Sequence, residues 1–272
     1  MNTEVARRPA LPGGRMLSDG RVVYWWAEIL AIVVFYLVYS AIRNIHGGGV
    51  DNPPAFAIEH ARQIISLERA VGIYHEATIQ DWAEHFTPLI VAANYFYGSF
   101  HFVVTIFAGV FLYRKWTDDY PRYRNMLAIT TAVALVGFTL YPLTPPRLLA
   151  TFGMDGGYTD TLAQYPTFWS FSSGGMQNVS NQFAAMPSVH IAWATWCALV
   201  LAPRLKSPVA RWLAILYPVL TLIVIVITGN HYVIDAAGGL AILAVGWFAS
   251  GAIESWRRSR RIGEPSPSLP DS

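Results

Sequence analysis

Long apolar runs, separated by short polar connections, recur along most of this chain. A helix needs about 20 mostly apolar residues to cross the roughly 30 Å hydrocarbon core of a bilayer. Six runs approach or reach that length, at residues 23–42, 88–112, 125–141, 186–202, 209–228 and 232–253. The pattern therefore predicts an all-α fold, a polytopic membrane protein built as a bundle of six transmembrane helices.

The connection between the first two predicted spans, residues 43–87, has a helical pattern of its own. Apolar residues recur there every three or four positions, and charged residues such as Glu68 lie off that stripe. The stripe consists of Ala57, Ala61, Ile64, Leu67 and Val71. This spacing is typical of an amphipathic helix on the outer membrane surface, and a small packed extracytoplasmic cap would produce the same pattern. The sequence allows both interpretations.

A second long connection, residues 143–187, is rich in Gly, Ser, Pro and aromatic residues. Loops of this length usually carry function, so we predict an outer active-site loop. The segments 1–22 and 257–272 contain several Pro and Gly residues, and we expect disordered cytoplasmic tails there. Residues 23–256 then form the membrane domain.

Composition agrees with a membrane protein and excludes other classes. A hydrophobic content of 54% against 13% charged residues is outside the balance of soluble domains. The net charge of +2 is too small for a nucleic-acid-binding protein, which needs a basic face. The single cysteine, Cys197, excludes an intramolecular disulfide and the cysteine clusters of zinc sites. The expected partners are the membrane and its lipids, with no role for nucleic acid.

The basic residues are distributed unevenly across the predicted spans. Fifteen of the 19 Lys and Arg residues precede the first span, follow the sixth, or lie in the second and fourth connections, counting Arg211 at the start of the fifth span with the fourth connection. Cytoplasmic segments retain cations, so we predict that both termini are cytoplasmic and that the opposite face is extracytoplasmic. In a bacterial cell the membrane would be the plasma membrane.

Few ionisable residues lie within or beside the predicted spans, where they cost free energy unless they are paired or hydrated. Asp235 and His231 are four residues apart at the start of the sixth span, which places them on one helical face. His190 opens the fourth span, and Arg147 follows the third. All four are predicted at the extracytoplasmic ends of their helices, so they can converge at one membrane depth.

These residue types favour phosphoryl transfer. An imidazole hydrogen-bonded to a carboxylate is held in one tautomer, with its other nitrogen basic and nucleophilic. A second, protonated imidazole can give a proton to a departing alkoxide, and the planar fork of Arg147 matches phosphate oxygens. Backbone N–H groups at the start of the fourth span, with the Ser188 hydroxyl, are further donors to an anion. This chemistry requires no metal and no cofactor.

The same residues allow other interpretations. Ser188 with His231 and Asp235 would form a serine-hydrolase triad, although the G-x-S-x-G elbow is absent. The same His–Asp pair with the second histidine would make a zinc site of two histidines and one carboxylate. His101 and Tyr97, one turn apart in the second span, are expected to line a substrate cavity, while a lone histidine in a membrane is as often a packing residue.

Two motifs resemble a known family. Residues 187–190, Pro-Ser-Val-His, resemble the Pro-Ser-x-His signature of the type 2 phosphatidic acid phosphatase superfamily. Residues 229–235, Gly-Asn-His-Tyr-Val-Ile-Asp, resemble its third motif, His-x-x-x-Asp. Together with Pro-Pro-Arg at residues 145–147, the third motif is more similar to the inositol phosphorylceramide synthase branch. The resemblance covers about residues 95–239.

The resemblance implies a role for each residue. His231 would be the nucleophile that forms a phosphohistidine, and Asp235 would orient it. His190 would act as general acid and later as general base, and Arg147 would clamp the phosphate. The remaining predicted phosphate- or substrate-binding residues are Ser188, Asn230, Tyr232, His101 and Tyr97.

The chain departs from the family pattern at positions that usually carry cations. The lysine of the superfamily's first motif corresponds to Leu140, and the Ser-Arg pair before the third motif falls on Val224 and Ile225. A bound phosphate would meet less positive charge here. The donor is therefore expected to be a phosphodiester lipid, which carries less negative charge than a phosphomonoester.

The sequence thus predicts a metal-independent enzyme that cleaves a lipid phosphate ester, through a phosphohistidine, at the extracytoplasmic face. With a lipid alcohol as acceptor it would be a phosphotransferase that moves a phospho head group, and this is the function we favour. With water as acceptor it would be a phosphatase for a phospholipid or a polyprenyl phosphate. A transporter of an anionic substrate is the alternative from another class, but the sequence shows no inverted repeat and its charges gather at one face.

Overall fold

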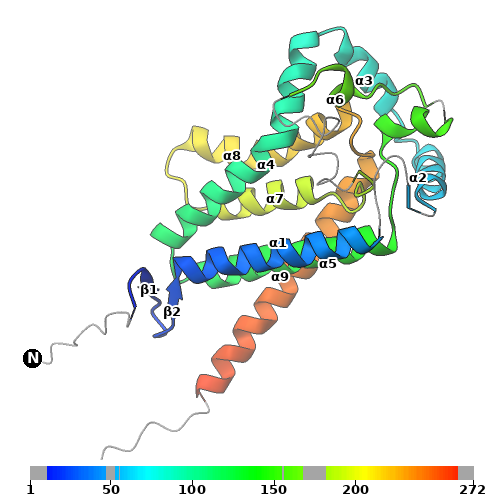
Figure 1. The fold of residues 1–272 in the computed structure, drawn as a ribbon. Coiled ribbons are helices and arrows are strands. Elements are labelled where there is room, and N and C mark those ends of the chain that lie inside the picture. Colours follow the sequence, from blue (N-terminus) through cyan, green and yellow to red (C-terminus); the bar gives the residue numbers. More distant parts are fainter. Residues whose placement is uncertain (1–10, 47–52, 55, 155, 168–181, 263–272) are drawn as a thin grey trace, which may run out of the picture.

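The computed structural model of the chain is mostly helical and describes residues 11–46, 53–54, 56–154, 156–167 and 182–262. Its longer helices are α1 (Trp25–His46), α4 (Thr87–Lys115), α5 (Tyr120–Leu140), α7 (Val189–Leu201), α8 (Pro208–Ile227) and α9 (Val233–Ile262). These helices form one bundle, in which α5 packs along α9 and α7 contacts α4, α8 and α9 (Figure 1).

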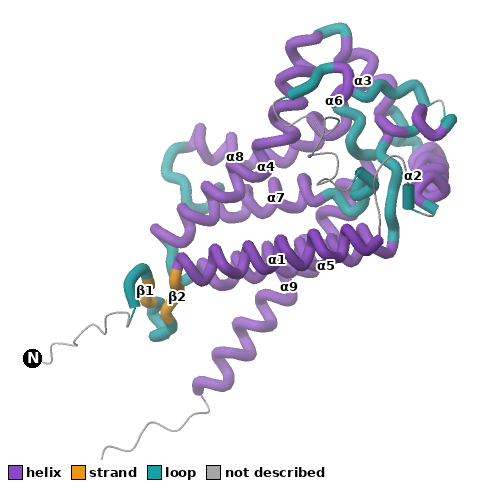
Figure 2. Tube along the Cα trace, viewed as in Figure 1, coloured by secondary structure: helices purple, strands orange, loops and turns teal. Residues whose placement is uncertain are grey.

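Shorter elements occupy the two ends of the bundle. One end carries α2 (Ala57–Val71), α3 (Glu76–Glu84), the 3-10 helices η1 (Pro146–Leu148) and η2 (Ala150–Phe152), and α6 (Thr161–Gln164). We refer to α2 and α3 together as the cap. The other end carries β1 (Gly14–Met16) and β2 (Val22–Tyr24), which are the only strands within the described ranges (Figure 2).

Four helices, α4, α5, α8 and α9, are long and apolar enough to cross a membrane. Their outward faces are apolar, with Phe248 of α9 73% exposed and Leu213 of α8 65% exposed. Surfaces of this kind are stable in lipid and not in water, so the apolar helices indicate an integral membrane protein. In α1 the apolar stretch Trp25–Val38 is shorter, and the number of six spans stays a prediction.

The predicted first residue of the fourth span, residue 186, lies three residues before the helix starts in the structure. α7 starts at Val189 instead of residue 186, because Ser188 caps the helix and its Oγ accepts the Ile191 N–H at 3.5 Å. Its 13 residues rise only about 20 Å along the helix axis. Trp196 of α7 is buried, and its indole N–H donates to the Tyr123 carbonyl oxygen at 2.9 Å. α7 is therefore a central packing helix of the bundle.

The predicted disorder of segment 1–22 is wrong for its described part, because residues 14–24 form a hairpin. β1 and β2 pair antiparallel, and the Leu17 N–H donates to the Arg21 carbonyl oxygen at 2.8 Å, which leaves residues 18–20 as the loop. Gly20 has a φ of +81°, the left-handed conformation that a three-residue hairpin loop needs. The hairpin is joined to α9 by an ion pair of 3.2 Å between Arg21 Nη2 and Glu254 Oε2. The Asp19-Gly20 dipeptide is the sequence signal for this turn.

The predicted start of the C-terminal tail at residue 257 is also wrong, because α9 runs to Ile262. No Gly or Pro interrupts the chain between Ala252 and Ile262, and arginines favour the C-terminal turns of a helix. Residues 1–10 and 263–272, where we also predicted disorder, lie outside the described residues.

The predicted helix between the first two spans is present as α2, but its buried face differs from the predicted one. Three residues of the apolar stripe are buried, whereas Leu67 and Val71 are 45% and 59% exposed. Glu68 is fully buried instead, because its carboxylate accepts the Ile234 N–H at the start of α9. The buried face of α2 packs in one cluster with Leu143, Leu149, Tyr158, Ala185 and Tyr232. Of the two interpretations, the structure supports the packed cap.

The predicted outer loop, residues 143–187, is partly ordered into short helices. Its described residues contain η1, η2 and α6, and Leu143 pairs with Ala184 in an isolated parallel bridge. Residues 155 and 168–181 of this loop lie outside the described residues. The described part of the loop therefore lies at the end of the bundle beside the cap.

Gly246 marks a close approach of α9 to α5 and supplies a test of this packing. A Cβ at this position would lie 2.2 Å from Thr130 Oγ1 and 2.7 Å from the Met126 carbonyl oxygen. Gly246→Ala must push the two helices apart, so we expect the free energy of unfolding to fall by about 1–3 kcal/mol. Thermal unfolding of the detergent-solubilised protein measures the change.

Gly251→Ala is the matched control on the same helix, because a Cβ there meets nothing within 4 Å. Alanine favours helices over glycine, so this variant should be as stable as the wild type or slightly more stable. Equal losses in both variants, or none in Gly246→Ala, would contradict the close crossing of α5 and α9.

Candidate active site

The turn between α8 and α9 places His231 two residues before the first residue of α9. Gly229 has a φ of +65°, and a Cβ there would lie 3.2 Å from Arg147 Cβ, so the position suits glycine alone. The His231 N–H donates to the Ile225 carbonyl oxygen at 3.2 Å. His231 precedes α9 rather than lying in it, but its ring still meets the side chain four residues ahead.

Asp235 holds the His231 ring. Its Oδ2 lies 3.2 Å from His231 Nδ1 and accepts the Tyr232 backbone N–H at 2.9 Å. Asp235 is fully buried and His231 is 2% exposed. A carboxylate at Nδ1 assigns the proton to that nitrogen and leaves Nε2 as the basic atom of the ring.

His190 faces this basic nitrogen from the first turn of α7. Its Nδ1 lies 3.3 Å from His231 Nε2, within hydrogen-bond distance. The structure therefore brings together the three predicted catalytic residues, His231, Asp235 and His190, in a continuous chain of hydrogen bonds.

Two predicted substrate residues of α4 pack on His190. The Tyr97 ring stacks on the His190 ring with 4.5 Å between centroids, and the His101 ring meets it edge-on at the same centroid separation. His101 Nδ1 lies 2.9 Å from the Tyr97 carbonyl oxygen, which accepts its N–H. Both residues therefore border the histidine pair, as expected for the walls of a site.

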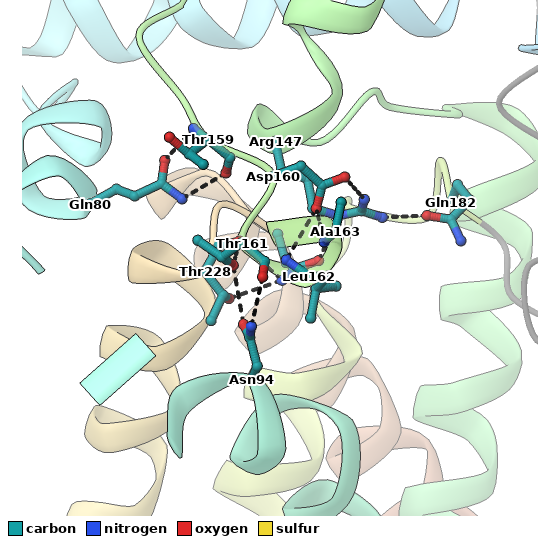
Figure 3. Close-up of polar contacts among 11 residues, drawn as sticks. Gln80, Asn94, Arg147, Thr159, Asp160, Thr161, Leu162, Ala163, Gln182 and Thr228 are labelled. Atoms are coloured by element: carbon teal, nitrogen blue, oxygen red, sulfur yellow. Dashed lines mark hydrogen bonds and ion pairs between the residues drawn. The ribbon is translucent and has the colours of Figure 1, made fainter. Parts of the chain in front are cut away.

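Arg147, in η1, is 8% exposed and surrounded by acceptors. Its Nε donates to Asn230 Oδ1 at 2.9 Å, its Nη1 to Asp160 Oδ2 at 2.9 Å and its Nη2 to Gln182 Oε1 (Figure 3). Its backbone N–H donates to the Gly229 carbonyl oxygen at 2.8 Å. Arg147 is thus attached to the turn that carries His231.

The positions of Ser188 and Tyr232 indicate structural roles. Ser188 is fully buried, caps α7, and donates its N–H to the Asp235 carbonyl oxygen at 3.0 Å. Because His231 bonds to His190, the serine-hydrolase alternative has no support in the geometry. The Tyr232 hydroxyl donates to the Thr144 carbonyl oxygen at 3.1 Å, and its ring is buried against the cap.

The zinc alternative also finds no support in the side-chain positions. Across the part of the chain that the structure describes, no three His, Cys, Asp or Glu side chains are placed to hold a metal ion.

Four polar residues around this site were not predicted as site residues from the sequence. The residue type of Asp160 indicated a possible helix N-cap, because Asp is preferred at that position. In the structure its Oδ1 accepts the N–H groups of Leu162 and Ala163 at the start of α6 (Figure 3). No sequence pattern indicated that Gln182 would contact Arg147. The other two, Glu68 and Glu76 of the cap, contact the start of α9 and are described below.

The fold and the site define a helical membrane protein with a buried His–Asp pair, a second histidine and an arginine. A family profile of the PAP2 superfamily matches residues 62–249, which include all four of these residues. The chain belongs to the PAP2 superfamily, and this membership supports a phosphatase or phosphotransferase type of function. No curated protein and no solved structure matches the chain.

The pairing of Arg147 with Asp160 is testable. Asp160→Asn keeps an oxygen for the α6 cap but removes the negative charge from the buried guanidinium. We expect the free energy of unfolding to fall by about 1–3 kcal/mol. Inorganic phosphate, a tetrahedral anion that fits a guanidinium, should raise the unfolding temperature of the variant more than that of the wild type.

The control for this variant is Glu59→Ala, which removes the exposed ion pair of 3.3 Å between Glu59 and Arg62. Exposed pairs contribute about 0–1 kcal/mol, so its unfolding temperature should match that of the wild type. A wild-type unfolding temperature for Asp160→Asn, with no added effect of phosphate, would contradict the pairing.

Proposed function

We propose that the protein is an integral-membrane phosphotransferase that moves a phosphate-bearing lipid head group through a phosphohistidine on His231. The observation that carries the proposal is the position of the His231 ring, with Nδ1 on Asp235 and Nε2 facing His190. One nitrogen is oriented by a carboxylate, and the other is a basic nucleophile next to a proton donor.

The first half-reaction forms a phosphorus–nitrogen bond at His231 Nε2 and breaks the phosphorus–oxygen bond to the leaving alcohol. His190, protonated, gives its proton to the departing oxygen. The His190 ring must turn away from its 3.3 Å contact with Nε2 to let the phosphorus in. In the second half-reaction the acceptor hydroxyl attacks the phosphorus, His190 takes its proton, and the bond to Nε2 breaks.

The charge around the site supports a phosphodiester donor. Arg147 supplies positive charge, but it is already paired with Asp160. Two positions that usually carry Ser and Arg in this superfamily are the buried, apolar Val224 and Ile225. A substrate with one negative charge suits this balance better than a dianionic phosphomonoester. A phosphodiester donor is compatible with the resemblance to the inositol phosphorylceramide synthase branch, which implies a phosphoinositol-like head group.

The molecule that accepts the phosphoryl group distinguishes the two enzymatic hypotheses. A lipid alcohol makes the protein a phosphotransferase, and water makes it a phosphatase for a phospholipid or a polyprenyl phosphate. The transporter alternative is not favoured, because the charged groups lie at the ends of their elements: His190 is in the first turn of α7, His231 precedes α9 and Arg147 lies in η1.

The cap end is proposed to be extracytoplasmic. The hairpin and the end of α9 lie together at the opposite end, joined by the Arg21–Glu254 ion pair. That end also contains the ion pair of 2.5 Å between Arg124 and Glu28. Basic residues concentrated at one end support a cytoplasmic position for it.

Variants of the three catalytic residues test the mechanism. His231→Ala should abolish turnover, because no other group forms the bond to phosphorus, while Asp235→Asn should retain a small residual rate. His190→Ala should lower the rate by about 10²- to 10⁴-fold, most strongly for donors with poor leaving groups. Turnover and acid-labile labelling of the enzyme by a ³²P-labelled phospholipid are the measurements, and an active His231→Ala enzyme would refute the nucleophile.

The acceptor can be identified directly. The purified protein is incubated with labelled phospholipids, with and without lipid alcohols, and the products are analysed by mass spectrometry. A new phosphodiester that depends on the lipid alcohol is expected. Without the alcohol, release of a phosphorylated head group from a phosphodiester, or of free phosphate from a phosphomonoester, at the same rate would identify a phosphatase. A faster reaction with phosphatidic acid than with any phosphodiester would contradict the proposed donor.

A further inference from the structure

The cap contributes two buried carboxyl groups to the start of α9. Glu68 of α2 and Glu76 of α3 are both fully buried. Glu68 Oε1 accepts the Ile234 N–H at 2.8 Å, and Glu76 Oε1 accepts the Val233 N–H at 3.0 Å. The preceding backbone N–H, that of Tyr232, donates to Asp235 Oδ2. Three consecutive backbone donors are therefore received by three carboxyl groups.

A helix start needs such acceptors when it is buried. The first N–H groups of a helix have no partner within the helix, and they carry the positive end of its dipole. In most helices a side chain at the start of the helix itself accepts these N–H groups. Here the acceptors come from residues 157 and 166 positions away in the chain. The start of α9 is thus held by the cap.

The side chains of the two glutamates also interact with each other. Their Oε2 atoms are buried, and no donor from the described residues reaches them. A hydrogen bond between two carboxyl groups requires that one of them carries a proton. Burial, and next to it the hydrogen bond with Glu76, raise the pKa of Glu68 from its ordinary value of 4.5 to about 8. At neutral pH Glu68 therefore keeps its proton.

The surroundings of the pair explain why this proton stays. Among the described residues, the titratable groups that interact with the pair are anionic or neutral. They are Tyr74, which follows α2, Tyr158 of the outer loop, Tyr232 of the turn before α9, and Asp235 of α9.

We propose that Glu68 and Glu76 are positioning residues of the active site, which fix the start of α9 and thereby hold His231 against His190. The inference rests on the proposed function and extends it by assigning a role to the cap. Neither glutamate touches the reacting atoms. Both act on the two residues that follow Tyr232, and Tyr232 directly follows His231.

The test compares three variants in the full-length protein. Glu68→Ala removes the acceptor for the Ile234 N–H and should lower kcat by about 10- to 100-fold, because small displacements of a nucleophile are costly. KM should change little, since Arg147 keeps Asp160 and Gln182 as partners. Glu68→Gln keeps an acceptor oxygen and supplies an N–H for Glu76, so its kcat at pH 7 should be close to that of the wild type.

The pH profile separates positioning from general destabilisation. The folded state raises the pKa of Glu68, so the stabilising contribution of its neutral form is complete below pH 4.5 and is lost as the pH rises through about 8. The wild-type kcat should therefore fall about tenfold between pH 7 and pH 9 as the proton leaves. Glu68→Gln has no such proton to lose, so its kcat should not show this fall between pH 7 and pH 9.

Glu59→Ala is the matched control, because Glu59 lies on the same helix but is exposed. Its kcat and pH profile should match those of the wild type. Hydrogen exchange of the amides of residues 232–235 gives a readout without turnover, and exchange should be faster in Glu68→Ala than in the control.

Each outcome decides one proposal. A wild-type kcat in Glu68→Ala, or a wild-type alkaline decline in Glu68→Gln, would overturn the positioning role. Should Glu68→Ala fail to fold, the pH profile of Glu68→Gln decides alone. A wild-type protein without phosphotransfer would instead refute the proposed function, and hydrogen exchange would still show whether the cap holds α9.

Discussion

The start of α9 is buried, and a helix that begins away from water must find acceptors for its first backbone N–H groups. Three carboxyl groups from three elements supply them: Asp235 of α9 itself, Glu76 of α3 and Glu68 of α2. Two of these acceptors belong to the cap, so α9 keeps its buried start only when the cap is in place. The same contacts decide where His231 lies, because it directly precedes the first of the three amides.

Glycines allow the other elements to approach this point. A Cβ at Gly239 of α9 would lie 2.4 Å from the Ser188 carbonyl oxygen, at the start of α7. Gly229 accepts the Arg147 N–H, and a Cβ on this glycine would crowd the arginine. Gly246 permits the close crossing with α5 farther along the helix. These approaches explain how residues from α7, η1 and α9 meet at one end of the bundle.

The charge of Arg147 is balanced by protein groups. Arg147 is buried, and its donors are occupied by Asp160, Asn230 and Gln182. Under the proposed function, an anionic head group has to replace one of these acceptors, and replacing the carboxylate of Asp160 by one negative charge preserves the balance. Arg147 is thus oriented before substrate arrives, which lowers the cost of binding in a site with little access to water.

The apolar runs of the sequence alone determined a helical membrane protein, because long apolar helices are stable in lipid. The spacing of His231 and Asp235 also predicted their contact, since four residues along the chain are enough for it. Only the tertiary structure decided that Glu68 is buried while Leu67 of the same helix is exposed. Periodicity reports which face of a helix is apolar, and it does not report which distant donor will meet a carboxylate. The acceptors at α9 and the partners of Arg147 exist only once segments far apart in the chain have packed together.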